Sequence, residues 1–141
     1  MSGPRYEELE VGMKLPAREF PVRRADLVRY AGASGDFNEI HWNERFAVEV
    51  GLPNVIAHGM FTMAEVFRVV TDWAGDPGAV LECGVRFTQP VVVPDDGVGA
   101  VIEVSGKIGA LLGDNKARVD LVVTSAGHRV LTKPFAVVRL P

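Results

Sequence analysis

The chain has 141 residues, of which 48% are hydrophobic and 23% are charged, and its formal net charge is −3. This length favours a single domain over residues 1–141, and the composition is that of a globular protein with a real core. The negative net charge, without any basic run, argues against nucleic acid as a partner. Cys83 is the only cysteine, no apolar run approaches the ~20 residues of a membrane span, and the first residues lack an export signal. We therefore predict a cytoplasmic protein with no intrachain disulfide and no membrane partner.

The first part of the chain predicts short elements around an irregular segment. After an irregular lead-in, Ala17–Val22 is expected to be a short strand, which Pro21 confines to a sheet edge or a strand end. Apolar residues at helical spacing predict a helix over Arg24–Ala33, and the glycines that follow should end it. A second, short helix is predicted from Asn43, as its N-cap, to Val50.

The stretch 59–73 predicts a helix of a different character. Apolar residues cover most of its helical wheel, and the polar Thr62, Glu65, Arg68 and Asp72 fall on one narrow stripe. A helix that is apolar on nearly all sides must be enclosed by other structure. We therefore expect this helix to be central and largely buried.

Beyond a turn signal at 75–78, the sequence predicts strands joined by short connectors. The connectors at 94–97, 112–115 and 126–127 are expected to be hairpin turns, which favours an antiparallel sheet. The predicted fold class is therefore α+β, with one antiparallel β-sheet wrapped around a central helix. Such a sheet leaves an edge strand unpaired and a groove open beside the helix, and dimerisation through the edge is the expected remedy. The expected strands are Val80–Val93, Gly99–Ile108, Ala117–Ser125 and His128–Leu140.

The segment from Asp36 to His41 carries the side chains best suited to chemistry. Asp36 and His41 lie five positions apart with Asn38 between them, so a continuous helix would point the pair to different faces. Gly35 predicts that the helix stops, and an irregular loop can turn both side chains toward one water. Taken singly, these residues are more often a helix-ending aspartate and a surface histidine. Together they have the arrangement that acid–base chemistry on a small molecule needs.

A second candidate group lies at the start of the predicted helix 59–73. A helix N-terminus carries unpaired N–H groups and a partial positive charge. Gly59 has no side chain, so a ligand oxygen could approach its backbone N–H closely and find an oxyanion site there. The neighbouring His58 is expected to orient the helix start through a hydrogen bond rather than to act directly in catalysis.

Two other chemistries have less support. Asp36, His41 and His58 offer ligand types that suit zinc or iron, but their spacing matches no HxxxH or CxxC pattern, so we predict no metal. Ser34 lacks the flanking Gly-x-Ser-x-Gly elbow of a hydrolase nucleophile.

The stretch Tyr30-Ala-Gly-Ala-Ser-Gly-Asp-Phe-Asn-Glu-Ile-His-Trp, followed by Ala57-His-Gly-Met, resembles the hydratase signature of the MaoC-like family. These are (R)-specific enoyl-thioester hydratases and (3R)-hydroxyacyl-thioester dehydratases with the hot-dog fold, and the resemblance extends over nearly the full length. Within the family, the stretches 73–80, 85–88 and 93–97 look most like the B subunits of type II fatty-acid elongation dehydratases of the mycolic-acid pathway. The resemblance implies one hot-dog domain over residues 1–141 and a hydro-lyase that needs no cofactor.

The resemblance also implies roles for individual residues. Asp36 and His41 would hold and activate one water, and the Gly59 N–H would hydrogen-bond the thioester carbonyl. Asn38 would help to fix the loop. The residues expected to contribute to substrate binding are Asn38, His58, Met60 and Phe67.

Two positions depart from the family pattern. Glu39 stands where a proline usually follows the asparagine, which puts the rigidity of the loop in question. Phe67 stands where some bacterial members carry a small polar residue that supports the aspartate. This second departure predicts a more apolar pocket, adapted to long acyl chains.

The partner and the competing functions stay open at this point. The substrate would be an acyl-CoA or an acyl-ACP thioester, and the chain would form a homodimer or a heterodimer with a second hot-dog subunit that supplies the acyl groove. A hot-dog thioesterase that uses Glu65 is the competing enzyme, but it leaves Asp36 and His41 without a role. A non-catalytic acyl-binding module would require neither of those two residues.

Overall fold

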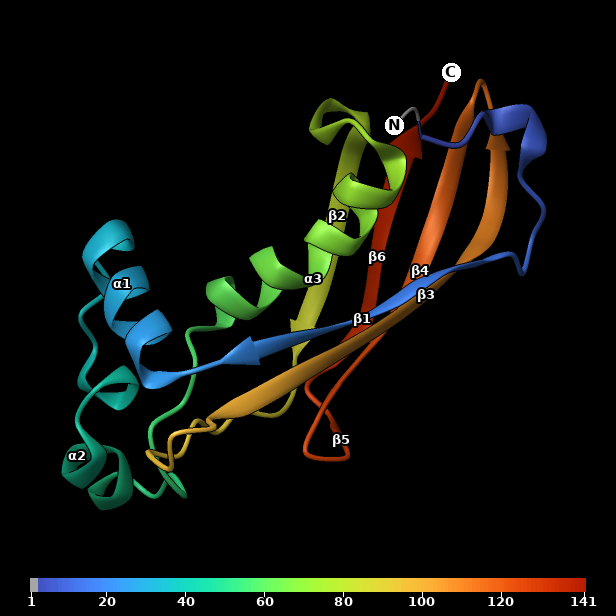
Figure 1. The fold of residues 1–141 in the computed structure, drawn as a ribbon. Helices are drawn as coiled ribbons and strands as arrows, with labels where there is room; N and C mark the ends of the chain where they lie inside the picture. Colours follow the sequence, from blue (N-terminus) through green and yellow to red (C-terminus); the bar gives the residue numbers. More distant parts are fainter. Residues whose placement is uncertain (1–2) are drawn as a thin grey trace.

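The computed structural model describes residues 3–141 as one antiparallel sheet with a long helix lying along one face (Figure 1). Residues 1 and 2 of the expected lead-in lie outside the described part. None of the helices in residues 3–141 is long and apolar enough to cross a membrane. The strands are β1 (Lys14–Val22), β2 (Val80–Phe87), β3 (Ala100–Gly113), β4 (Lys116–Ser125), β5 (His128–Arg129) and β6 (Leu131–Arg139). The α-helices are α1 (Arg24–Ser34), α2 (Glu44–Glu49) and α3 (Gly59–Ala74), and the short 3₁₀ turns are Tyr6–Glu8, Glu39–His41 and Pro77–Ala79.

The sheet has the strand order β1-β3-β4-β6-β2, and the two-residue β5 pairs with β4. β3, β4 and β6 form the predicted antiparallel meander. Asp114 and Asn115 join β3 to β4 with φ angles of 53° and 57°, as in a tight hairpin turn. The predicted alternation along β4 is confirmed, because Val119, Leu121 and Val123 are at most 5% exposed and face the core.

The prediction of one strand over residues 80–93, followed by a hairpin at 94–97, is wrong. β2 ends at Phe87 and pairs with β6 instead of β3, so the chain crosses to the other side of the sheet before β3 begins. Pro90 has no N–H with which to continue the ladder. Near the end of the crossing, the Asp96 side chain accepts hydrogen bonds of 2.8 and 2.9 Å from two backbone N–H groups and closes the turn.

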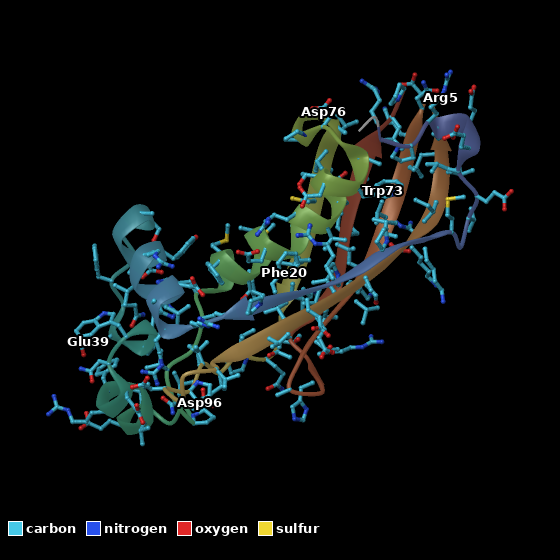
Figure 2. All side chains as sticks on the ribbon, viewed as in Figure 1. Arg5, Phe20, Glu39, Trp73, Asp76 and Asp96 are labelled. Atoms are coloured by element: carbon cyan, nitrogen blue, oxygen red, sulfur yellow. The ribbon has the colours of Figure 1, made fainter. Side chains whose placement is uncertain are left out.

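The helix predicted over 59–73 is confirmed as α3, and the sheet covers one of its sides. Val66 and Val70 are fully buried toward the sheet, and Phe20 of β1 fills the space beneath the helix (Figure 2). The opposite side is open, since the Met60 side chain is 58% exposed. The predicted polar stripe is wrong at one position: Thr62 is 3% exposed and faces inward.

The segment between β1 and α3 lies beyond the end of the sheet, beside the start of α3 (Figure 1). α1 ends as predicted, because Gly35 takes a left-handed φ of 77° and its N–H donates to Ala31 O at 2.9 Å. Asn43 is the N-cap of α2, and its side chain accepts from the Phe46 N–H at 3.2 Å. The residues from 35 to 43 between these helices are called the site loop below.

Arg24 anchors this segment to the rest of the molecule. Its Nε donates to Val93 O at 2.6 Å, and its Nη2 donates to Asn54 Oδ1 at 2.7 Å. The start of α1 is thereby held against the chain that leads into α3 and against the crossing that leads into β3.

Candidate active site

The site loop is ordered by its own polar side chains. Asp36 N–H donates to Ser34 Oγ at 3.1 Å, and Asn38 N–H donates to Asp36 Oδ1 at 3.2 Å. Ile40 N–H in turn donates to Asn38 Oδ1 at 3.3 Å. Short side chains of these types commonly bond the backbone two residues ahead, and the repeated pattern fixes the path of the loop. The loop therefore has a defined course although Glu39 stands in place of a proline.

His41 is held in one tautomer by the backbone. The side chain is 6% exposed, and its Nδ1 lies 2.7 Å from Ile56 O. A carbonyl oxygen can only accept, so Nδ1 carries the proton and Nε2 keeps a free lone pair. The backbone of Ile56 also donates to Ile40 O at 3.1 Å, so the two segments are joined on both sides of the ring. His41 is thus oriented to act as a base through Nε2.

The His58 ring stacks on the His41 ring. The two rings stack with centroids 3.8 Å apart and an angle of 21° between their planes, and Tyr30 packs its edge against His58 at 4.7 Å. His58 is 2% exposed, and its Nε2 donates to the backbone oxygen of Asp36 at 3.1 Å. The other nitrogen, Nδ1, is buried and has no hydrogen-bond partner among residues 3–141.

Burial is the main reason why the pKa of His58 lies below its usual value of 6.5. The hydrogen bond to Asp36 O raises this pKa, the neighbouring His41 lowers it, and the Asp36 carboxylate raises it by the smallest amount of the four. The balance favours the neutral ring. A proton added at Nδ1 would be buried without an acceptor.

The neutral, buried His58 predicts a loss of stability in acid. Its folded-state pKa lies below the value of 6.5 expected in the unfolded chain, so the unfolded state binds more protons between these two values. The free energy of unfolding should therefore fall as the pH drops below about 6.5, whereas above that pH the contribution of His58 is constant. Denaturant titrations of the wild-type chain and of His58→Gln, which cannot take up the proton, should show a flatter acid limb for the variant. Identical slopes in the two proteins would contradict burial of a neutral ring.

Asp36 is exposed, and it lies close to both histidines. One ligand atom from each of Asp36, His41 and His58 lies within 4.8 Å of the others. Two groups hydrogen-bonded to one water lie about 4.5 Å apart, so these separations allow the cluster to hold one shared water. The expectation that it binds no metal stays a prediction.

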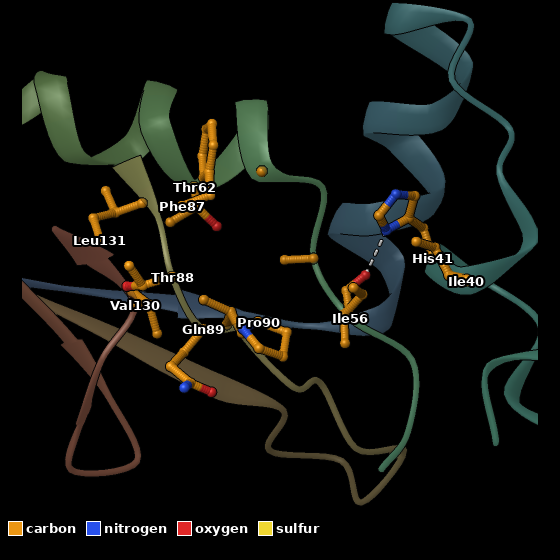
Figure 3. A pocket seen from close by; sticks show the side chains of 13 residues that line it. Ile40, His41, Ile56, Thr62, Phe87, Thr88, Gln89, Pro90, Val130 and Leu131 are labelled. Carbon is orange, nitrogen blue, oxygen red and sulfur yellow. Dashed lines mark hydrogen bonds between the residues drawn. The ribbon is translucent and has the colours of Figure 1, made fainter. Parts of the chain in front are cut away.

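A cavity of about 340 Å³ opens between the site loop and the start of α3 (Figure 3). His41 lines one wall and Gly59 and Thr62 line a second. The rest comes from the residues 87–91 that end or follow β2, and from Ile40, Ile56, Ala57, Val130 and Leu131. Asp36 does not line this cavity, so His41 is the group that connects the carboxylate with it. Most of the lining is apolar, as a site for an acyl chain requires.

Gly59 is the first residue of α3, where a backbone N–H has no partner within the helix. No hydrogen bond from this N–H to any of residues 3–141 is found. The Phe87 ring covers the glycine closely, since a Cβ at position 59 would lie 3.1–3.4 Å from three of its atoms. Gly59 lines the same cavity as His41, and its N–H has no hydrogen-bond partner among the described residues.

The structure does not bring all of the expected residues to the cavity. Met60 is exposed, and Phe67 is 9% exposed within the core; neither lines the cavity, which α3 faces with Gly59 and Thr62. Asn38 orders the site loop instead, because its side chain accepts a hydrogen bond from the Ile40 backbone N–H. Glu65, the residue proposed for a thioesterase, does not line this cavity and pairs with an arginine on the same helix at 2.9 Å.

Four contributors to the site were not found from the sequence. Ile56 orients His41 through a backbone oxygen, which no side-chain pattern reveals. Phe87 and Gln89 line the cavity from a stretch that the sequence assigned to an uninterrupted strand. Trp42 braces the site loop by donating from Nε1 to Phe37 O at 2.9 Å. The proline at position 90 was the available signal that this stretch leaves the sheet.

Comparisons with known proteins identify the family of this chain. The family described as MaoC like domain matches residues 8–126. The 3-hydroxybutyryl-CoA dehydratase of Methylorubrum extorquens is 28% identical over 137 residues, which are 96% of this chain and 83% of that protein. Among solved structures, a MaoC-like dehydratase is 38% identical with a TM-score of 0.95, over 99% of this chain and 43% of that one. The chain thus spans less than half of the latter protein.

Two further structures are informative. The (R)-hydratase from A. caviae involved in PHA biosynthesis is 25% identical with a TM-score of 0.82, over 96% of this chain and 99% of that one. The HadBC (3R-hydroxyacyl-ACP dehydratase) complex from Mycobacterium tuberculosis is 19% identical with a TM-score of 0.69, over 90% of this chain and 95% of that one, and shows the fold alone. The finer resemblance to subunits of elongation dehydratases therefore stays a prediction. With most of its length matched by the family, and with one antiparallel sheet packed on a long helix in the hot-dog manner, the chain belongs to the MaoC-like family.

Proposed function

We propose that this chain interconverts (3R)-hydroxyacyl and trans-2-enoyl thioesters, with Asp36 and His41 as the acid–base pair and the Gly59 N–H as the donor to the thioester oxygen. The names of the relatives, 3-hydroxybutyryl-CoA dehydratase and (R)-hydratase, support this hydro-lyase reaction. The observation that carries the assignment of residues is the fixed tautomer of His41, whose Nδ1–H is bound to Ile56 O. The free Nε2 belongs to a ring that lines the same cavity as Gly59.

The chemistry of hydration follows from these positions. Asp36 and His41 share one water and remove its proton as the water oxygen bonds to C3 of the enoyl group. The electrons of the C2=C3 bond move toward the thioester carbonyl, whose oxygen gains negative charge and accepts a hydrogen bond from Gly59 N–H. The same pair then returns a proton to C2, which completes the addition of water. Dehydration is this path in reverse, and no step requires a cofactor.

The carrier and the acyl chain are further parts of the proposal. A thioester of either coenzyme A or acyl carrier protein presents the same carbonyl to Gly59, and a cytoplasmic location suits both carriers. Phe67 is packed in the core, so it would influence the acceptance of long chains only through the residues that it supports. Rates on C4 and on longer enoyl thioesters decide the point, and a preference for C4 would count against a long-chain pocket.

We also propose that the chain works as a dimer with a second hot-dog subunit, either a copy of itself or a different one. β2 is an edge strand of the sheet, and it exposes Leu81 and Phe87 by 48% and 53%. Met60 on the open side of α3 is 58% exposed. A partner that covers this edge would bury these side chains and close the adjoining cavity.

The decisive experiment uses the purified chain alone. It should be assayed with crotonyl and longer trans-2-enoyl thioesters on both carriers, with product chirality and free thiol measured and the mass in solution determined. Formation of the (3R)-hydroxyacyl product supports the proposal. Activity as a homodimer would rule out an obligatory partner subunit of a different sequence. Release of free thiol from a saturated acyl thioester would instead identify a thioesterase.

A further inference from the structure

His58 is buried at the centre of the site, but the proposed reaction assigns it no proton transfer. We propose that His58 is a positioning residue with two effects. Its side chain ties the backbone of Asp36 to the start of α3. Its ring stays neutral, so that the stacked His41 ring can accept a proton from the water without a second positive charge beside it. This inference rests on the proposed roles of Asp36, His41 and Gly59.

The first part of the inference is a geometric tie. His58 is the N-cap of α3 and is directly followed by Gly59, the proposed donor to the thioester oxygen. Through its side chain, it donates from Nε2 to Asp36 O at 3.1 Å. One residue therefore fixes the distance between the carboxylate that handles the water and the N–H that receives the negative charge. Small errors in such distances are costly, because a misplacement of about 1 Å can lower a rate about 100-fold.

The second part concerns charge. The groups that face His58 are His41 and Asp36 from the site loop and Tyr30 from α1. Because Nε2–H is donated to a carbonyl, the neutral ring has its lone pair on Nδ1, which is buried without a partner. Two protonated rings stacked at 3.8 Å would repel each other, so the pair can hold one added proton at a time. Burial lowers the pKa of His58, which leaves that proton to His41, the ring that lines the cavity.

Two substitutions separate the hydrogen bond from the ring. In His58→Gln the amide nitrogen is the same number of bonds from Cα as the imidazole Nε2, so the donor to Asp36 O is kept and the ring is lost. In His58→Phe the ring is kept and the donor is lost. The phenylalanine variant gives up the bond to Asp36 O, but it also removes the unpartnered buried Nδ1 and adds no new buried polar atom, so we expect it to fold.

We expect His58→Phe to lower kcat by about tenfold or more on crotonyl thioester, with KM changed by less than about twofold, because the reacting groups and not the acyl cavity are displaced. His58→Gln should recover most of this loss. A phenylalanine variant as active as the wild type would overturn the inference. Equal losses in both variants would overturn the tie through Asp36 O, and a change confined to KM would indicate a role in binding only.

A measurement without substrate completes the test. Nitrogen-15 NMR of the wild-type imidazoles should show His58 as the neutral Nε2–H tautomer throughout the pH range in which the enzyme is active. An Nδ1–H tautomer, or a His58 that becomes charged together with His41, would overturn the inference. Failure of the wild type to hydrate any thioester would refute the proposed function, but it would leave this NMR result unaffected, so the two failures can be told apart.

Discussion

Replacing His41 by asparagine, or Asp36 by asparagine, is expected to lower kcat/KM for enoyl-thioester hydration by about 10²-fold or more in each case. In His41→Asn the side-chain amide nitrogen takes the place of Nδ1, so the hydrogen bond to Ile56 O is kept and only the base at Nε2 is removed. In Asp36→Asn the remaining oxygen can still accept from the Asn38 N–H, so the loop keeps its path while the charge is lost. Each variant therefore isolates the acid–base function. Initial rates on crotonyl thioester, together with circular dichroism to check the fold, provide the measurement.

A variant that combines Asp36→Asn with His41→Asn tests whether the two residues act together. Because Asp36 and His41 are expected to act on one water, removing the second group should cost little after the first has gone. The combined loss should therefore be far smaller than the product of the two single losses. Two fully multiplicative losses would mean that the residues act in separate steps. Unchanged rates in both single variants would rule out the enzyme assignment as it stands.

The features that the sequence predicted are those encoded by local patterns. Alternation along β4, the helical spacing of α3 and the N-cap at Asn43 each depend on a few neighbouring residues, and each is found in the structure. Asp36 and His41 could be paired because both lie in one short loop. The single antiparallel sheet with a central helix followed from these local patterns.

The features that escaped prediction depend on contacts between distant segments. Whether β2 pairs with β3 or with β6 is decided by the packing of the whole sheet, so the crossing after Phe87 could not be read from a run of β-branched residues. Likewise, His41 takes its tautomer from Ile56, and His58 reaches the backbone of Asp36 across 22 positions. The sequence pattern groups Thr62 with Glu65, Arg68 and Asp72 on one polar stripe, but it is buried and lines the cavity.

One side of α3 is not covered by the sheet in the single chain. In the single chain, the sheet covers one face of the helix and leaves Met60 exposed, and β2 is an edge strand of the sheet. The sequence expectation of a helix enclosed on nearly all sides is therefore met by one chain only in part. Burial of the rest requires another surface, and this is why the apolar wheel of α3 supports a dimer as strongly as the free strand edge does.

Gly59→Pro is expected to lower kcat by about 10²–10³-fold, the loss typical of removing one oxyanion-hole donor. Proline is suited to this position, because the first residue of a helix has no intrahelical use for its N–H. The preceding residue is also compatible, since the φ of −59° and ψ of 134° at His58 lie in the extended region that a following proline requires. The substitution thus deletes the N–H that is proposed to bind the thioester oxygen and leaves the start of α3 intact.

The matched control is Gly59→Ala, which keeps the N–H but adds a Cβ in the same place. That Cβ would lie 3.1–3.4 Å from atoms of the Phe87 ring, so both variants require the ring to shift by a few tenths of an ångström. The ratio of the alanine to the proline rate therefore reports the replacement of the N–H by the proline Cδ, free of the steric cost of the Cβ that the two variants share. If the two variants lose the same activity, the crowding against Phe87 accounts for the loss, and the thioester oxygen must find its donor elsewhere in the cavity.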